Sequence, residues 1–115
     1  MGAVWSSHSL AIAAVLQENG IPMITPLSTN PEVTKAGDYV FRVCFTDDFQ
    51  GKIMTAFAHD DSVAAAAVIL TNITSYYSME LARYFEKTAR EKGIKILWEG
   101  KYKEKVTDFS EIVMP

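Results

Sequence analysis

Cysteine, basic charge and long apolar runs are scarce in this sequence, and each scarcity excludes a class of protein. Cys44 is the only cysteine among 115 residues, so an internal disulfide and a metal centre built on cysteine pairs are excluded. Eleven Lys and Arg stand against fourteen Asp and Glu, a net charge of -3, and no basic cluster suggests nucleic-acid binding. No apolar run approaches the about 18 residues of a transmembrane helix, so we expect no membrane insertion.

Further chemistry is missing at the level of single residues. Cys44 lies between two apolar residues, which predicts a small buried thiol and not a nucleophile. His8 and His59 are far apart, with no carboxylate spacing that suits a metal ion, so we expect neither a metal nor a cofactor. Residues 1–5 lack the basic start and apolar stretch of a secretory signal, which predicts a cytosolic chain or a mature form.

What is present indicates one globular α/β domain over residues 1–115. Hydrophobic residues make up 49% and charged residues 22%, a balance that can build a core without disulfides or metals. Strand-like and helix-like segments alternate, which favours a three-layer sandwich with a mostly parallel sheet of about five strands, as in flavodoxin-like folds. The strands are expected at residues 2–5, 21–27, 39–43, 63–71 and 94–98, and two of the helices at residues 10–19 and 77–92. Asp47 and Asp48 can cap another helix, with Ile53, Met54 and Phe57 on its buried face, and Thr107 or Asp108 can cap a last one through Val113.

Three segments carry clear local signals. An apolar residue recurs every four positions from Tyr77 to Ala89, which predicts the buried face of a helix that ends at Gly93. Residues 63–71 form a continuous apolar run, typical of a strand buried in a parallel sheet, although the four alanines within it have poor β-propensity. Residues 28–38 are polar and predict a long loop, and such loops often carry function.

Polar residues follow the ends of the predicted strands, where open α/β sheets bind their ligands. The serines within residues 6–9 precede a helix whose first amides are positively polarised, so they could seat a carboxylate or phosphate, or simply cap the helix. The hydroxyl of Thr29 and the backbone carbonyls of residues 27–30 could hold an ammonium group, or form a turn that ends at Pro31. These patterns alone leave both alternatives open.

The acidic pair Asp47 and Asp48 suggests a different chemistry. Two aspartates after a strand resemble the acidic pocket of receiver domains, which hold a divalent ion for phosphorylation of an aspartate. That pocket also needs an aspartate after a middle strand and a lysine after the last one. Asn72 is the nearest candidate for the former, and Lys101 or Lys103 for the latter. A receiver-like phosphoacceptor is therefore an alternative function.

Several short segments join these features into one resemblance. They are Ser6-Ser7, ENGIPMITP at 18–26, TNPEVT at 29–34, YVFR at 39–42, DFQG at 48–51, YSMELA at 77–82 and TDFS at 107–110. In this order they resemble the branched-chain amino-acid (Leu/Ile/Val) binding proteins, the extracytoplasmic solute receptors of ABC importers. The resemblance covers almost the whole chain and implies a partial lobe of the type I periplasmic binding fold.

The resemblance implies roles for five residues. Ser6, with Ser7 beside it, would bind the carboxylate of an amino acid at a helix N-terminus. The carbonyl of Leu27 and the hydroxyl and amide of Thr29 would hold the α-amino and carboxylate groups. Tyr77 would close over the ligand from the opposite lobe. Proteins of this family are not enzymes; they trap a solute by hinge closure and deliver it to an ABC permease.

Family members are longer and have two complete lobes. By resemblance, residues 1–45 belong to the first lobe and residues 46–115 to the second, so we expect an internal piece or a redesign that crosses the hinge once. The truncation is expected to weaken native binding, and the alternative is a non-binding scaffold whose two half-lobes merge into one flavodoxin-like sheet. We expect a periplasmic or extracytoplasmic protein, and a homodimer, because half-lobes leave sheet edges and apolar surface uncovered.

Overall fold

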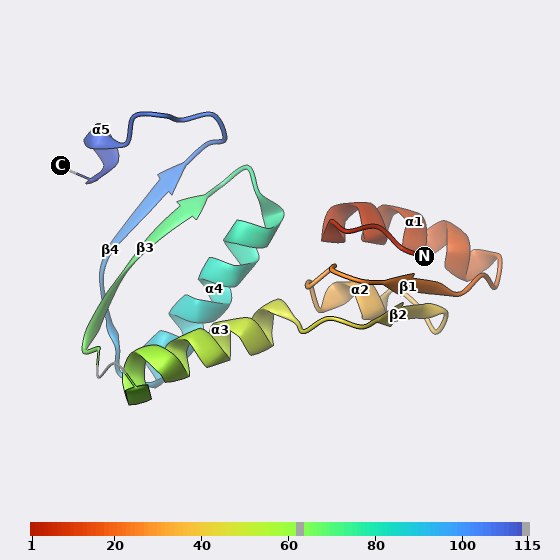
Figure 1. Cartoon of the computed structure of the whole chain (residues 1–115), viewed down its shortest axis with the longest axis horizontal. Helices are drawn as coiled ribbons and strands as arrows, with labels where there is room; N and C mark the ends of the chain where they lie inside the picture. The colour runs from red at the N-terminus through yellow and green to blue at the C-terminus, as the bar shows by residue number, and fades with distance from the viewer. Residues whose placement is uncertain (62–63, 114–115) are drawn as a thin grey trace. The chain divides into compact units, whose positions relative to one another are not determined.

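The chain folds into α-helices and parallel β-strands that form two compact units, Met1–Asp47 and Asp48–Pro115. The structure is a computed structural model that describes residues 1–61 and 64–113. Figure 1 shows the elements of both units with their labels. Within these described residues, none of the helices combines the length and the apolar character that crossing a bilayer requires.

The first unit packs two helices on one face of a small parallel sheet. Its elements are, in chain order, α1 (Ser6–Glu18), β1 (Met23–Thr25), α2 (Glu32–Lys35) and β2 (Val40–Arg42). Met23 of β1 lies opposite Val40 of β2, and both are buried together with Ala13 of α1 and Val33 of α2. The core of this unit therefore lies on the Met23 and Val40 side of the sheet.

The opposite face of the β1–β2 sheet is open. Ile24 and Phe41, the next pair in the register, are 50% and 51% exposed. The predicted three-layer sandwich needs helices on this face as well. In the described part of the first unit that third layer is missing, because both α1 and α2 contribute to the core on the Met23 and Val40 side.

Helix α1 begins at Ser6, earlier than predicted, and its serines do not cap it. The N-cap is Trp5, which makes no side-chain capping bond. Ser6 and Ser9 instead hydrogen-bond to the loop after β1, through Asn30 and Ser28 respectively. The capping interpretation of these serines is therefore wrong, because Trp5 is the N-cap and the hydroxyls of Ser6 and Ser9 bind residues of the loop instead. The end of α1 follows the prediction, since the chain turns at Gly20 with φ of 63°.

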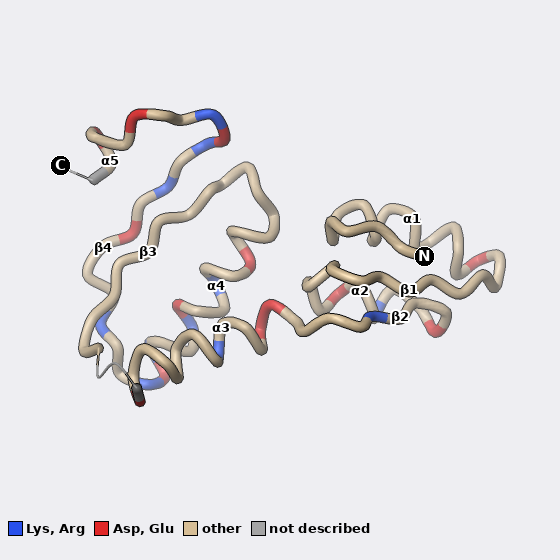
Figure 2. Tube along the Cα trace, viewed as in Figure 1, with Lys and Arg blue, Asp and Glu red and all other residues tan. Residues whose placement is uncertain are grey.

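The second unit contains the longer pair of strands. Its elements are α3 (Asp47–Ala56), which starts on the last residue of the first unit and continues as the π-helical turn η1 (Phe57–Asp61), then β3 (Ala66–Asn72), α4 (Tyr76–Glu91), β4 (Lys95–Tyr102) and α5 (Ser110–Val113). Strands β3 and β4 pair in parallel, with an irregularity between Ala67 and Val68. Helix α4 connects them and packs against both. Figure 2 shows that β3 carries no charged residue, whereas β4 carries both signs.

Helices α3 and α4 approach each other closely at a glycine. Gly51 of α3 is buried, and a Cβ placed on it would lie 2.8 Å from the Cβ of Tyr84. One turn further along, the hydroxyls of Thr55 and Thr88 lie 2.6 Å apart, and Thr55 also donates to the carbonyl of Gly51 at 2.9 Å. A missing side chain and a pair of hydroxyls thus allow the close packing of these two helices.

The α/β class and the parallel strand pairing are confirmed, while the number and arrangement of strands differ from the prediction. The described residues contain four strands in two separate sheets. Residues 2–5, expected as a strand, form none; Gly2 donates a single backbone hydrogen bond to Ile24. The merged flavodoxin-like sheet is wrong, because β1 and β2 lie in one unit and β3 and β4 in the other.

Strand β3 is also less buried than predicted. Val68 and Leu70 are 66% and 42% exposed. Alternate residues of a strand face opposite sides of the sheet, and α4 packs against one side of β3. The predicted first residue of this strand, Val63, lies outside the described residues, as do Met114 and Pro115 beyond the last helix.

Candidate functional site

The N-terminus of α1 and the loop after β1 meet in the first unit. The hydroxyl oxygen of Ser6 accepts a hydrogen bond from the backbone N–H of Asn30 at 3.2 Å. Ser6 is partly buried, and Ser7 is exposed. Because Trp5 offers no capping side chain, no cap neutralises the positive end of the α1 dipole near this loop. The structure therefore places a hydroxyl and a positively polarised helix end beside residues 29–30.

Buried hydroxyl groups hold this loop in place. Ser28 is fully buried, and its Oγ lies 2.8 Å from Thr25 Oγ1 and 2.7 Å from Ser9 Oγ. The same hydroxyl lies 3.1 Å from the backbone carbonyls of Ala3 and Val4. Buried polar groups of this kind are costly unless all are satisfied, and satisfied networks fix a unique conformation. The Ser28 hydroxyl therefore anchors the loop after β1 to α1, to β1 and to the backbone of residues 3–4.

A second anchor for the loop comes from Arg42 at the end of β2. Its Nη1 donates to the backbone carbonyls of Asn30 at 2.7 Å and Ser28 at 3.3 Å, and its Nη2 donates to the hydroxyl of Thr34 at 3.1 Å. The sequence pattern did not indicate this role, because an arginine in a short strand looks like an ordinary polar residue. The available signal was its place in the YVFR segment of the resemblance.

Asn30 and Thr29 link the loop to the elements that follow. Asn30 is 1% exposed, and its Oδ1 accepts a hydrogen bond from the backbone N–H of Glu32 at 2.8 Å, which starts α2. The carbonyl of Thr29 accepts from the backbone N–H of Asp47 at 2.9 Å. Leu27 keeps a side chain that is 58% exposed. Four predicted site residues, Ser6, Ser7, Leu27 and Thr29, therefore belong to the first unit.

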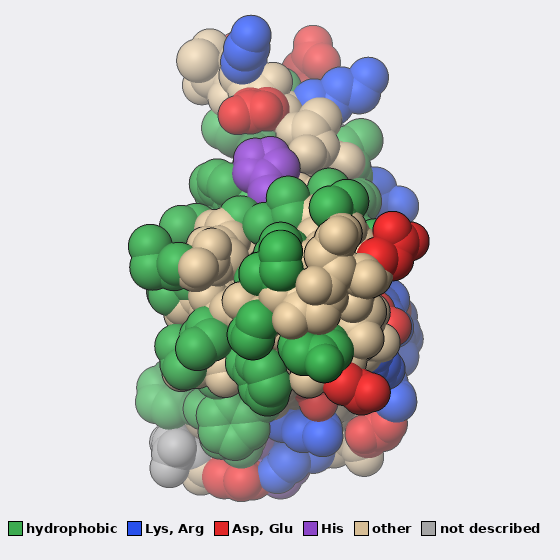
Figure 3. Space-filling view, turned by 90° about the vertical axis from the view of Figure 1, so that its right-hand side faces the viewer, with side chains coloured by type: hydrophobic (Ala, Val, Ile, Leu, Met, Phe, Trp, Pro, Cys, Tyr) green, Lys and Arg blue, Asp and Glu red, His purple; other side chains and the backbone are tan. Residues whose placement is uncertain are grey.

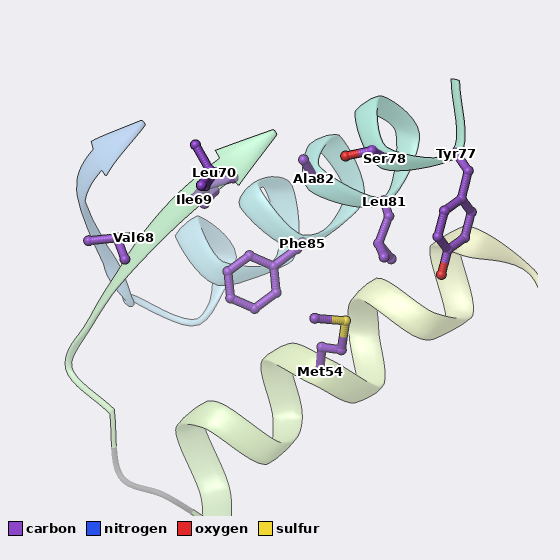
Figure 4. A pocket seen from close by; sticks show the side chains of 9 residues that line it. All are labelled: Met54, Val68, Ile69, Leu70, Tyr77, Ser78, Leu81, Ala82 and Phe85. Carbon is purple, nitrogen blue, oxygen red and sulfur yellow. The ribbon is translucent and has the colours of Figure 1, made fainter. Parts of the chain in front are cut away.

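Tyr77, the fifth predicted site residue, belongs to the second unit. It is 38% exposed, near the start of α4, and its hydroxyl donates to Gln50 Oε1 of α3 at 3.2 Å. Tyr77 also lines an open pocket of about 300 Å³ between α3, α4 and β3. Figure 4 shows Met54, Leu81 and Phe85 pointing into this space. No charged side chain lines the pocket, so it lacks groups that would hold the charged ends of an amino acid.

The described residues contain no group of three or more His, Cys, Asp or Glu side chains placed to hold a metal ion. Cys44 is partly buried, less than the buried thiol that was predicted. Burial raises the pKa of its thiol, and the opposing charge of Arg42 does not cancel that effect. A raised pKa keeps the thiol protonated near neutral pH, which does not suit a nucleophile.

Comparison with known proteins gives one consistent result. The family model described as periplasmic binding protein matches residues 1–114. A Leu/Ile/Val-binding protein of Rhizobium johnstonii is 33% identical over 95 residues, which are 82% of this chain and 26% of the relative. An amino acid binding protein of Pseudomonas aeruginosa is 33% identical over 102 residues, 87% of this chain and 27% of its own length.

Solved structures give the same result. A leucine binding protein from Thermotoga maritima has 41% identity and a TM-score of 0.86, and the match covers 96% of this chain and 31% of that one. A branched-chain amino acid transporter substrate binding protein from Streptococcus pneumoniae, solved in complex with isoleucine, has 29% identity and a TM-score of 0.84, with the same coverage. The chain thus spans about a quarter of the length of the curated relatives and about a third of the solved ones.

Proposed function

The chain belongs to the periplasmic binding protein family, and from that premise we propose that it is an amino-acid-binding module of an ABC import system, with a branched-chain amino acid as its solute. The family consists of solute-binding proteins, and the names of the similar proteins support this choice of solute. On this proposal the chain works outside the cytoplasm, presents its solute to an ABC permease and catalyses no reaction.

The observation that carries the proposal is the hydrogen bond between Asn30 and Ser6, which joins the N-terminus of α1 to the loop after β1. An amino acid presents a carboxylate and an ammonium group close together. The carboxylate suits Ser6, Ser7 and the positive end of α1, and the ammonium group suits the carbonyl of Leu27 and the hydroxyl of Thr29. The solute contacts are proposed to be these five groups together with Tyr77.

The division into units suggests how Tyr77 takes part. We assign residues 1–45 to the first lobe of the family fold and residues 46–115 to the second. The unit boundary at Asp47 and Asp48 supports this assignment, because the chain passes from one compact unit to the other there. Tyr77 then contributes from the second lobe when the two lobes close on a solute.

Calorimetric titration with leucine, isoleucine and valine tests the proposal. Ser6→Ala and Thr29→Ala each remove a hydrogen bond to a charged group, so each should weaken binding by about 1.5–3 kcal/mol. Thr107→Ala, an exposed position in the second unit, is the matched control and should bind as the unaltered chain does. A chain that takes up none of the three amino acids would contradict the proposal and favour a non-binding scaffold. Unchanged affinity in both site variants would contradict the residue assignment.

We also propose that the chain forms a homodimer at micromolar concentration. Large apolar side chains are exposed in both units, among them Trp5, Val43, Phe57 and Val68, each more than half exposed. Figure 3 shows hydrophobic side chains gathered over the middle of the face that it presents. Association would remove such side chains from water. Light scattering over about a hundredfold range of concentration tests this, and a particle of monomer mass throughout would refute it.

A further inference from the structure

Arg42 reaches the two peptide carbonyls that flank Thr29. Its Nη1 donates to the carbonyl of Asn30 at 2.7 Å and to that of Ser28 at 3.3 Å. The Nη2 atom extends the contact to the hydroxyl of Thr34 at 3.1 Å. One side chain from β2 therefore fixes the backbone on both sides of a proposed solute contact.

The chemistry of guanidinium suits this task. Its donors lie in one plane with fixed spacing, and hydrogen bonds from a charged donor are about twice as strong as neutral ones. The three acceptors are neutral oxygens, so these bonds set the course of the backbone and do not form an ion pair. A lysine in the same place has a single nitrogen and cannot reproduce the planar fork.

Ser6 binds the loop at Asn30, the same residue whose carbonyl Arg42 binds. Asn30 donates through its backbone N–H to Ser6 and accepts through its carbonyl from Arg42. Asn30 is 1% exposed, so these two bonds lie at a buried residue where water competes little. Ser6 is held by helix α1, so a shift of Asn30 would move the backbone of Thr29 and leave the Ser6 hydroxyl in place.

We propose that Arg42 is a positioning residue of the solute site. It sets the direction of the backbone at residues 28–30, so that the Leu27 carbonyl and the Thr29 hydroxyl meet the ammonium group of the amino acid, and it does not itself contact the solute. This inference rests on the proposed function. Beyond that function, it states that selectivity for an α-amino group depends on Arg42, which holds the loop and does not touch the solute.

The test compares leucine with 4-methylpentanoate, which has the same side chain and carboxylate but no ammonium group. In Arg42→Gln the affinity for leucine should fall about tenfold or more, while that for 4-methylpentanoate should change by less than about threefold. Arg42→Lys should restore part of the selectivity. Arg83→Gln is the matched control, because Arg83 pairs with Glu80 on the exposed side of α4, and its selectivity should equal that of the unaltered chain.

A second measurement needs no solute and separates this inference from the proposed function. Amide hydrogen exchange at Asn30 should quicken in Arg42→Gln by about tenfold, while exchange at buried Met23 stays as it was. Equal loss of affinity for leucine and 4-methylpentanoate would overturn the inference, and so would unchanged exchange at Asn30. The unaltered chain could bind no amino acid while Asn30 still loses protection in Arg42→Gln. That result would contradict the proposed function, and Arg42 would remain the residue that fixes the backbone of this loop.

Discussion

Replacing Gly51 by alanine should destabilise the second unit, although alanine favours helices more than glycine does. The added Cβ would lie 2.8 Å from the Cβ of Tyr84 and 3.0 Å from the backbone nitrogen of Phe85. Neither atom is the free end of a flexible side chain, so α3 and α4 must move apart. Replacing a helical glycine by alanine stabilises by about 1 kcal/mol, whereas overpacking costs about 1–3 kcal/mol. The balance for Gly51→Ala is a loss of about 0–2 kcal/mol in the free energy of unfolding, and Gly51→Val should lose more.

Urea unfolding followed by circular dichroism measures this loss. Lys52→Ala is the control on the same helix, because Lys52 is exposed and its 3.9 Å contact with Asp48 is a surface ion pair. Such a pair contributes little, so this variant should stay within about 0.5 kcal/mol of the unaltered chain. If Gly51→Ala raised the free energy of unfolding by about 1 kcal/mol, helix preference would have prevailed and the close contact between α3 and α4 would be refuted.

Two further predictions concern the core and the surface. Met23→Ala should cost about 2–5 kcal/mol in a denaturant melt, because Met23 is fully buried. Ile24→Ala, at a half-exposed neighbour, should cost much less, and equal losses would show that the core is misplaced. Hydrogen bonds with His59, and to a smaller extent with Lys92, lower the pKa of the Asp60 carboxyl. The stabilisation that the ionised Asp60 provides is therefore present at neutral pH and is lost as the pH falls through that lowered pKa. In an NMR titration His59→Phe should raise the pKa of Asp60, and an unmoved pKa would contradict the contact.

Local sequence signals predicted most helices and strands well, but they predicted poorly which strands pair. Gly20 and Gly93 both take positive φ at helix ends, as expected of glycine, and α4 lies within one residue of its predicted bounds. The four-residue α2 was missed inside a predicted loop, because its first turn depends on the buried side chain of Asn30. The separate sheets were missed because a strand pattern does not specify its partner, which distant parts of the chain decide.

The site shows the same division between local and distant causes. Resemblance pointed to Ser6 and Thr29, and the structure brings the α1 N-terminus to the loop that holds Thr29. Ser28 and Arg42 escaped prediction, since a serine in a polar segment and an arginine in a strand have no distinctive spacing. Their importance arises from burial and from hydrogen bonds to residues far along the chain, which the sequence pattern does not contain.

The division of the chain at Asp47 and Asp48 also has a consequence for folding during synthesis. The core residues of the first unit all precede Asp47, and its strand pair closes within that stretch. Domains generally fold as units during synthesis, the N-terminal ones first, while the ribosome adds about 5–20 residues per second. The loop that carries Ser28 and Asn30 can therefore acquire its hydrogen bonds while the residues of β3 and β4 are still being added.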